Sequence, residues 1–232
     1  MLEMDSVNTF YGNSHVLHDL TMQVGDDETV ALLGRNGAGK TTTIKSIMGI
    51  DTTVEGTITF EGTSLVGMTP DEVFNEGISW IPQERRVFPL LTVNENLTLG
   101  GHNGGEDQRE AIYDLFPRLE DRLEQRAGTL SGGEQQMLAI ARGLLSEPDL
   151  LLVDEPFEGL MPGLVTDLRD VLTELTAETD MSLLITSQKT DTVLEIVDRA
   201  LMIQNGSVEY EGPASELLGN VDLQEEYLGV GR

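Results

Sequence analysis

The chain has 232 residues, 39% of them apolar and 24% charged, so it can bury a substantial core and is neither disordered nor fibrous. Its 14 Lys and Arg against 41 Asp and Glu give a formal charge of −27, which disfavours binding to nucleic acid or to anionic lipid. It has no cysteine for disulfides or thiolate chemistry, no apolar run of membrane-spanning length and no visible secretory signal, so we expect a soluble intracellular protein.

The opening third is β-rich. Residues 16–24 alternate apolar and polar side chains, as in a half-buried strand, and residues 29–33 form a short apolar strand. A glycine-rich break at 34–39 follows, and residues 41–48 then have a helical pattern. Another strand is expected at 57–60.

The break at 34–41, Gly-Arg-Asn-Gly-Ala-Gly-Lys-Thr, matches the phosphate-loop pattern G-x-x-x-x-G-K-[ST] in full. Glycines let consecutive N–H groups face a phosphate, and the following helix adds the positive end of its dipole. Lys40 supplies charge to the β- and γ-phosphates, and the Thr41 hydroxyl is a ligand for Mg²⁺. A chance glycine-rich turn is the alternative, which the strand before and the helix after disfavour. The predicted ATP contacts are Gly34, Arg35, Asn36, Gly37, Ala38, Gly39, Lys40, Thr41 and Thr42.

Further along, Thr69 and Thr92 each open a Thr-x-x-Glu capping box that predicts a helix start. Between about residues 90 and 148 strand patterns vanish and the chain reads as helices and loops, with a joint at 100–105. Along the rest of the chain strand and helix patterns alternate, which predicts one α/β domain with a mostly parallel sheet and a helical insertion. The later elements are expected as strands at 150–154, 182–186 and 200–204 and helices at 163–178 and 190–197.

The apolar run at 150–153 ends in two carboxylates, Asp154 and Glu155. Because neighbouring side chains on a strand point apart, we expect the two acids to have different roles. Asp154 suits Mg²⁺, directly or through water, and Glu155 suits a proton acceptor that activates the attacking water. A solvated strand end is the alternative, but the pair follows four apolar residues in a chain that already has a phosphate loop.

Residues 130–136, Leu-Ser-Gly-Gly-Glu-Gln-Gln, contain a third capping box, Ser131 with Glu134. The box predicts a helix N-terminus with outward-facing N–H groups, which is a second phosphate-binding feature. The segment resembles the signature sequence of ATP-binding cassette (ABC) ATPases. This resemblance implies a head-to-tail dimer, in which each ATP lies between the phosphate loop of one subunit and Ser131, Gly132, Gly133 and Glu134 of the other.

The resemblance extends over essentially the whole chain. It implies a P-loop NTPase fold in one ABC ATPase domain, 1–232, with the core at about 1–89 and 149–232, an N-terminal antiparallel β subdomain and a helical subdomain at about 90–148. Tyr11 is similar to the family aromatic that stacks on adenine. Gln83 is similar to the glutamine that contacts Mg²⁺ and the attacking water.

Two positions depart from the family pattern. Gln188 stands where most members have a histidine that senses the γ-phosphate, and it can donate a hydrogen bond but cannot become charged. We therefore expect hydrolysis to depend on Glu155 with Gln83 and Gln188. Met161, in the loop after the second site, stands where many members have aspartate.

The motifs at 85–89, 115–119, 126–130 and 134–142 are similar to the ATPase subunits of branched-chain amino acid importers, and Gln188 is similar to the F-type subunit of that system. ATPases of urea and amide importers are a close alternative, and an exporter subunit or a soluble ABC ATPase is a more distant one. The transported molecule never touches this subunit, so its identity comes from the resemblance alone.

The resemblance implies partners at the cytoplasmic face of the membrane: a second ATPase subunit, identical or not, two membrane-spanning permease subunits and, indirectly, a substrate-binding protein. The segment 84–95 is similar to the groove that receives a permease helix. In it Arg85 and Arg86 provide charge and Phe88 and Leu90 provide apolar anchors.

The acidic residues are dispersed along the whole chain, and lysine occurs only at Lys40, Lys45 and Lys189. This distribution resembles halophilic proteins, which work in molar salt, where charges are screened within about 3 Å. For nearly all these carboxylates we expect a solvated coat without chemistry.

Overall fold

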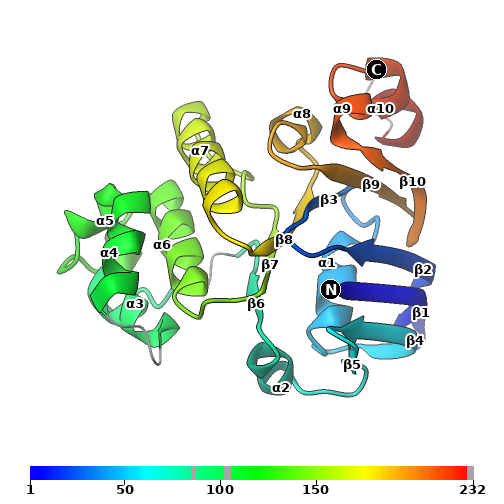
Figure 1. Ribbon diagram of the computed structural model, residues 1–232, viewed down its shortest axis with the longest axis horizontal. Coiled ribbons are helices and arrows are strands. Elements are labelled where there is room, and N and C mark those ends of the chain that lie inside the picture. Colours follow the sequence, from blue (N-terminus) through cyan, green and yellow to red (C-terminus); the bar gives the residue numbers. More distant parts are fainter. Residues whose placement is uncertain (85–86, 102–105, 229–232) are drawn as a thin grey trace.

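The computed structural model describes residues 1–84, 87–101 and 106–228 and contains two sheets with helices around them (Figure 1). An antiparallel sheet has the order β2-β1-β4-β5, and a second sheet has the order β10-β9-β3-β8-β7-β6, parallel except for the β9–β10 pair. The strands are β1 (Leu2–Tyr11), β2 (Ser14–Val24), β3 (Thr29–Leu33), β4 (Thr53–Phe60), β5 (Thr63–Ser64), β6 (Ile78–Ile81), β7 (Leu150–Asp154), β8 (Ser182–Ser187), β9 (Arg199–Gln204) and β10 (Ser207–Pro213). The helices are α1 (Lys40–Ile47), α2 (Pro70–Asn75), α3 (Val93–Gly100), α4 (Glu106–Leu115), α5 (Pro117–Glu120), α6 (Gly132–Leu144), α7 (Pro162–Glu178), α8 (Thr190–Leu194), α9 (Ala214–Leu217) and α10 (Val221–Leu228), with a 3₁₀ turn at Ala127–Thr129.

Two hydrophobic clusters cover opposite faces of the parallel strands. Leu150 and Leu152 of β7 belong to the cluster shared with α1 and the antiparallel sheet. Leu151 and Val153 belong to the cluster shared with α3, α6 and α7. Because successive side chains on a strand alternate between faces, a strand buried on both sides must be apolar throughout, as β7 is up to Asp154.

The carboxyl ends of three parallel strands carry the polar residues of interest. Residues 34–39 follow β3, Gln188 follows β8 and Glu155 follows β7. These strands are neighbours, with Leu33 beside Ser187 and Asp154 beside Thr186. Ligands of open α/β sheets bind outside such strand ends, so the fold gathers distant residues at one edge.

The predicted α/β fold with a mostly parallel sheet, an antiparallel N-terminal sheet and a helical insertion is confirmed. Strands β3 and β7 have the predicted bounds, and α7 begins one residue earlier than predicted. Strands β1, β5, β6 and β10 were not predicted. β6 has only four residues, and β1 is interrupted by a register shift between Met4 and Val7, so neither has a long regular alternation.

Helices α3, α4, α5 and α6 lie together, away from the antiparallel sheet (Figure 1). The division into a core at 1–89 and 149–232 and a helical subdomain at 90–148 stays a prediction. Residues 102–105 of the expected joint lie outside the described residues, and Gly100 ends α3. No helix within the described ranges is long and apolar enough to cross a membrane.

Candidate functional site

The loop between β3 and α1 depends on glycine at two tightly packed positions. Gly39 has φ 120°, and a Cβ there would lie 2.8 Å from Cδ2 of Leu17. A Cβ at Gly34 would lie 2.6 Å from the carbonyl oxygen of Ile203. Any larger residue would therefore displace the loop from β2 or β9.

Helix α1 begins directly after this loop, and no side chain caps its N-terminus at Gly39. The first N–H groups of a helix have no partner within the helix, and they carry the positive end of its dipole. Together with the loop they provide the backbone donors that bind phosphate in proteins.

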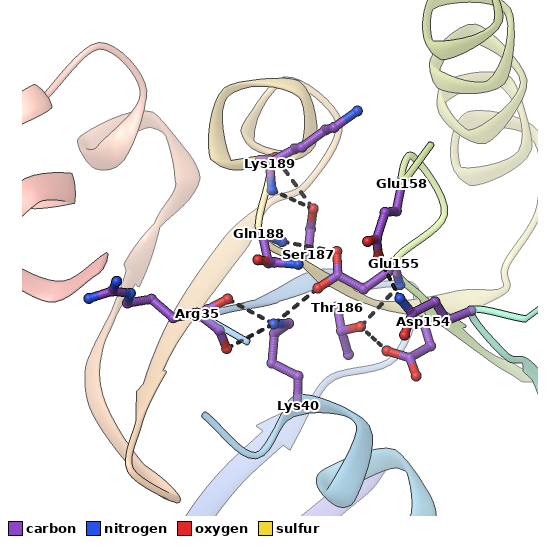
Figure 2. Close-up of polar contacts among 11 residues, drawn as sticks. Arg35, Lys40, Asp154, Glu155, Glu158, Thr186, Ser187, Gln188 and Lys189 are labelled. Carbon is purple, nitrogen blue, oxygen red and sulfur yellow. Dashed lines mark hydrogen bonds and ion pairs between the residues drawn. The ribbon is translucent and has the colours of Figure 1, made fainter. Parts of the chain in front are cut away.

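Lys40, at the start of α1, is buried and lies at the centre of a polar cluster (Figure 2). Its Nζ donates hydrogen bonds to the carbonyl oxygens of Gly34 at 2.8 Å and Arg35 at 3.2 Å. The same Nζ lies 3.0 Å from Oε1 of Glu155, which forms a buried ion pair. The ammonium thus lies where the loop after β3 meets the turn after β7.

Glu155 lies one residue beyond strand β7, although the argument from strand alternation treated it as part of the strand. Strand β7 ends at Asp154, and Glu155 has φ 50°, a left-handed conformation that is uncommon for residues other than glycine. Its Oε2 accepts a hydrogen bond from the N–H of Gln188 at 3.1 Å, and its own N–H donates to the carbonyl of Thr186 at 3.0 Å. The turn, rather than strand alternation, directs this carboxylate toward Lys40.

The environment of Glu155 disfavours its charged form. Burial raises the pKa of Glu155 above its usual range, although Lys40 and the N–H of Gln188 both favour the ionised carboxylate. The nearby charge of Asp154 acts in the same direction as burial. A carboxyl group with a raised pKa close to a cation is a suitable proton acceptor at neutral pH.

Asp154 is buried and contacts a different partner. Its Oδ1 accepts a hydrogen bond from the hydroxyl of Thr186 on β8 at 2.5 Å. The two neighbouring acids therefore contact different groups because of the turn at Glu155, and their separate roles stay a prediction.

A cavity of about 260 Å³ joins residues from four separate parts of the chain. Tyr11 is one of its lining residues, and the centre of the Tyr11 ring lies 5.8 Å from Nζ of Lys45. Val16 of β2 also lines the cavity, and it was not predicted because an apolar strand residue has no distinguishing pattern. A cavity of about 560 Å³ between α4 and α7 lacks a phosphate loop, so we assign the chemistry to the smaller one. The lining residues are Tyr11, Val16, Asn36, Gly37, Gly39, Lys40, Thr41, Thr42, Gln83 and Glu155.

Three predicted residues that do not line this cavity contact its lining residues through backbone atoms. Gly34 and Arg35 contact Lys40 through their carbonyls, and Gln188 reaches Glu155 through its backbone. Gln83 follows β6, and its Nε2 donates to Oε2 of Glu158 at 2.5 Å. Nothing in the sequence pattern marked Glu158, since it is one of 41 acidic residues.

The site offers only a few protein oxygens, which suits a Mg²⁺ ion that phosphate and water also coordinate. Within the ranges that the structure describes, no group of three or more His, Cys, Asp or Glu side chains could hold a metal by itself. Thr41, which carries a hydroxyl, and Gln83, which carries an amide oxygen, line the cavity, and Asp154, which is not a lining residue, directly precedes Glu155 in the chain. Mg²⁺ commonly takes one or two protein oxygens and completes its shell with phosphate and water, so these residues fit it.

The helix N-terminus at Ser131 lies outside the cavity. Ser131 instead lines a separate cavity of about 430 Å³ together with Met161 and Leu164. The capping box is present: the N–H of Ser131 donates to Glu134 at 2.8 Å, and the N–H of Glu134 donates to Ser131 at 3.3 Å. These two N–H groups complete the predicted capping box, and the outward-facing donors expected at this helix N-terminus stay a prediction.

The glycine at 133 has a packing role that the sequence did not reveal. A Cβ at Gly133 would lie 2.2 Å from Cδ1 of Leu164, so glycine allows α6 to approach α7 closely. Glu134, which closes the capping box, also pairs with Arg122 at 3.2 Å.

The chain resembles known proteins over nearly its full length. The family model described as "ABC transporter" matches residues 17–158. The high-affinity branched-chain amino acid transport ATP-binding protein BraG of Pseudomonas aeruginosa is 41% identical over 99% of this chain and 100% of that protein. The probable branched-chain amino acid transport ATP-binding protein LivF of Archaeoglobus fulgidus is 33% identical, over 99% of each chain.

Solved structures have the same fold. A nucleotide-free ATP-binding cassette from an ABC transporter superposes with a TM-score of 0.83 at 26% identity, covering 100% of this chain and 99% of the other. An ATP-binding cassette of an ABC transporter in its ADP conformation gives a TM-score of 0.82 at 26% identity, with 98% of each chain covered.

Proposed function

This chain belongs to the ABC transporter family, and we propose that it is the ATP-hydrolysing subunit of an importer for branched-chain amino acids. The proposal of ATP hydrolysis rests on one cavity, where the phosphate loop meets Tyr11, Gln83 and Glu155. The transported molecule follows from BraG and LivF, whose names state branched-chain amino acid transport.

ATP binding is assigned to the loop, Lys40 and Tyr11. The backbone N–H groups at the start of α1 and the Lys40 ammonium hold the phosphates, and the ring of Tyr11 stacks on the base. Lys40 at present contacts two carbonyl oxygens and Glu155, so it must exchange part of these contacts for phosphate oxygens. Mg²⁺, held by Thr41, Gln83 and Asp154, would neutralise phosphate charge.

Hydrolysis is assigned to Glu155. Its carboxylate accepts a proton from water, the water oxygen forms a bond to the γ-phosphorus, and the bond from that phosphorus to ADP breaks, which yields ADP and phosphate. Once Lys40 turns to phosphate, the ion pair that partly neutralises Glu155 weakens, and its carboxylate becomes more basic. Gln83 and the Gln188 side chain position the water and the γ-phosphate.

The proposal requires a second ATPase subunit. Because Ser131 lines a different cavity from Lys40, one chain does not surround a nucleotide with both features. A head-to-tail partner brings Ser131 and Gly132 of one subunit to the phosphate loop of the other. Met161 is 67% exposed beside Ser131, which supports an apolar contact at this dimer surface.

The contact with a permease subunit is assigned to an apolar surface at the edge of the parallel sheet. A cavity of about 550 Å³ is lined by Phe74, Trp80, Phe88 and Leu99. Leu90, close by in sequence, is 79% exposed. Exposed apolar patches of this kind commonly serve protein contacts. Arg85 and Arg86, the charged anchors expected here, lie outside the described residues.

The catalytic assignment is tested with Glu155→Gln. The variant should bind ATP with Mg²⁺, lose turnover by at least about a hundredfold because the proton acceptor is gone, and accumulate as an ATP-bound dimer. Turnover is measured by phosphate release and mass by light scattering in molar salt. The Lys40→Ala, Glu155→Gln double variant is the control and should stay monomeric, since it lacks the phosphate contact. Unchanged turnover, or a monomer with occupied sites, would contradict the proposal.

The transported molecule is tested in a reconstituted complex with the permeases and the binding protein. Leucine, isoleucine or valine should stimulate ATP hydrolysis. If urea or a short amide stimulated hydrolysis instead, the transported molecule would be that compound, and the assignment as an ATPase would stand.

A further inference from the structure

Gln83 and Glu158 are 75 residues apart, and a hydrogen bond joins them at the edge of the catalytic cavity. Gln83 follows β6, Glu158 lies in the turn after β7, and these two strands are paired neighbours. Nε2 of Gln83 donates to Oε2 of Glu158 at 2.5 Å, while Gln83 lines the same cavity as Lys40. The side chain of Glu158 leaves the same turn as that of Glu155 (Figure 2).

The chemistry of the two groups decides which end of the amide is held. A glutamine side chain has a donor end, NH₂, and an acceptor end, the carbonyl oxygen. An ionised carboxylate can only accept hydrogen bonds. Glu158 therefore holds the NH₂ end of Gln83 and leaves Oε1 for a cation or for a water proton.

We propose that Glu158 is a positioning residue that orients the amide of Gln83, so that its oxygen faces Mg²⁺ and the attacking water. The inference rests on the proposed function, since it deepens the role given to Gln83. Amide oxygens are suitable ligands for Mg²⁺, whereas the NH₂ end would repel it. Partners that orient a metal ligand commonly change metal affinity or activity by tenfold or more when they are removed.

The test compares three variants of the full chain. Glu158→Leu removes the acceptor. Glu158→Gln keeps an acceptor oxygen but can also donate, so Gln83 can bind in either orientation. Glu209→Leu removes one acid that is exposed on β10, which controls for the change in net charge.

Two titrations measure how these substitutions change the binding of Mg²⁺ with ATP. The Mg²⁺ concentration that half-saturates ATP binding should rise about tenfold in Glu158→Leu, by a smaller factor in Glu158→Gln and not at all in Glu209→Leu. The ATP dissociation constant in EDTA should be equal in all four proteins. The kcat should fall about tenfold in Glu158→Leu, with an intermediate value in Glu158→Gln.

A readout independent of activity is the side-chain amide signal of Gln83 in ¹⁵N NMR spectra. The signal is assigned by its loss in Gln83→Ala. It should shift when Glu158→Leu removes its hydrogen bond, and it should be unchanged in Glu209→Leu.

The outcomes separate the inference from the proposed function. Wild-type Mg²⁺ dependence and kcat in Glu158→Leu would overturn the positioning role, whether or not the amide signal moves. If wild type hydrolyses no ATP, the proposed function fails instead. The Mg²⁺ titration of ATP binding then still decides whether Glu158 orients Gln83.

Discussion

Lys40 and Glu155 form the central contact at the scale of single residues. The ammonium contacts two loop carbonyls and a buried carboxylate, so it links the loop after β3 to the turn after β7. The pKa of Glu155 is nevertheless raised, because desolvation outweighs the attraction of Lys40 and of the N–H of Gln188. The site thus contains a charge that is useful for catalysis and unfavourable for the fold.

The raised pKa of Glu155 predicts how the stability of the fold depends on pH. A folded-state pKa above the unfolded value means that the folded protein binds more protons between the two values, so stability falls as pH rises through that window. Glu155→Gln removes this loss. Scanning calorimetry at constant high salt gives the thermal midpoints of the variant and the wild type. The difference, variant minus wild type, should therefore increase as the pH rises from 4 toward neutrality. A difference independent of pH would show that burial does not perturb Glu155.

At the scale of elements, the turn between β9 and β10 connects strand β2 with the loop between β3 and α1. The N–H of Gly206 donates to the carbonyl of Ala38 at 2.8 Å, and the carbonyl of Gly206 accepts from the N–H of His18 at 3.0 Å. A Cβ at Gly206 would lie 2.0 Å from the carbonyl oxygen of Val16. The turn therefore fixes the distance between β2 and the phosphate loop.

Gly206→Ala should weaken ATP binding several-fold and lower the thermal midpoint. Both effects follow because the added methyl separates β2 from the loop. Gly219→Ala is a matched control, since Gly219 has φ 76° against 84° for Gly206, and nothing lies within 4 Å of its Cβ position. In both variants alanine is forced into a left-handed backbone conformation at a cost of about 1–2 kcal/mol. Only in Gly206→Ala does the added methyl also clash with the carbonyl oxygen of Val16. Equal ATP affinity and equal midpoints in the two variants, by fluorescence titration and thermal melts, would refute this coupling.

At the scale of the whole molecule, the charge of −27 is the dominant property. Repulsion among dispersed carboxylates opposes a compact chain, and salt shortens its range from about 10 Å at 0.1 M to about 3 Å at 1 M. Only some acids have cationic partners, such as Glu28, which pairs with Arg199 at 2.7 Å.

The chain should therefore lose helical signal in circular dichroism as NaCl is lowered from molar to about 0.1 M, where screening reaches only about 10 Å. Restoring the salt should restore the signal. Sucrose, which favours compact states without screening charge, should protect less than salt does. A signal that does not respond to salt would contradict the halophilic interpretation of the composition.

The sequence alone determined the features that lie within a few neighbouring residues. The phosphate loop at 34–41, the apolar strands around it and the capping boxes at Thr92 and Ser131 depend on local dihedrals and local hydrogen bonds, so their patterns are visible in the chain. The same locality made Asp154 and Glu155 recognisable, and the family resemblance followed from these segments.

Only the tertiary structure decided which distant groups meet. The pairing of Lys40 with Glu155, the hydrogen bond from Gln83 to Glu158 and the packing of Gly133 on Leu164 depend on the strand order β3-β8-β7-β6 and on how α6 approaches α7. No local pattern encodes these contacts. They arise because burying both faces of the sheet brings separate strand ends to one edge.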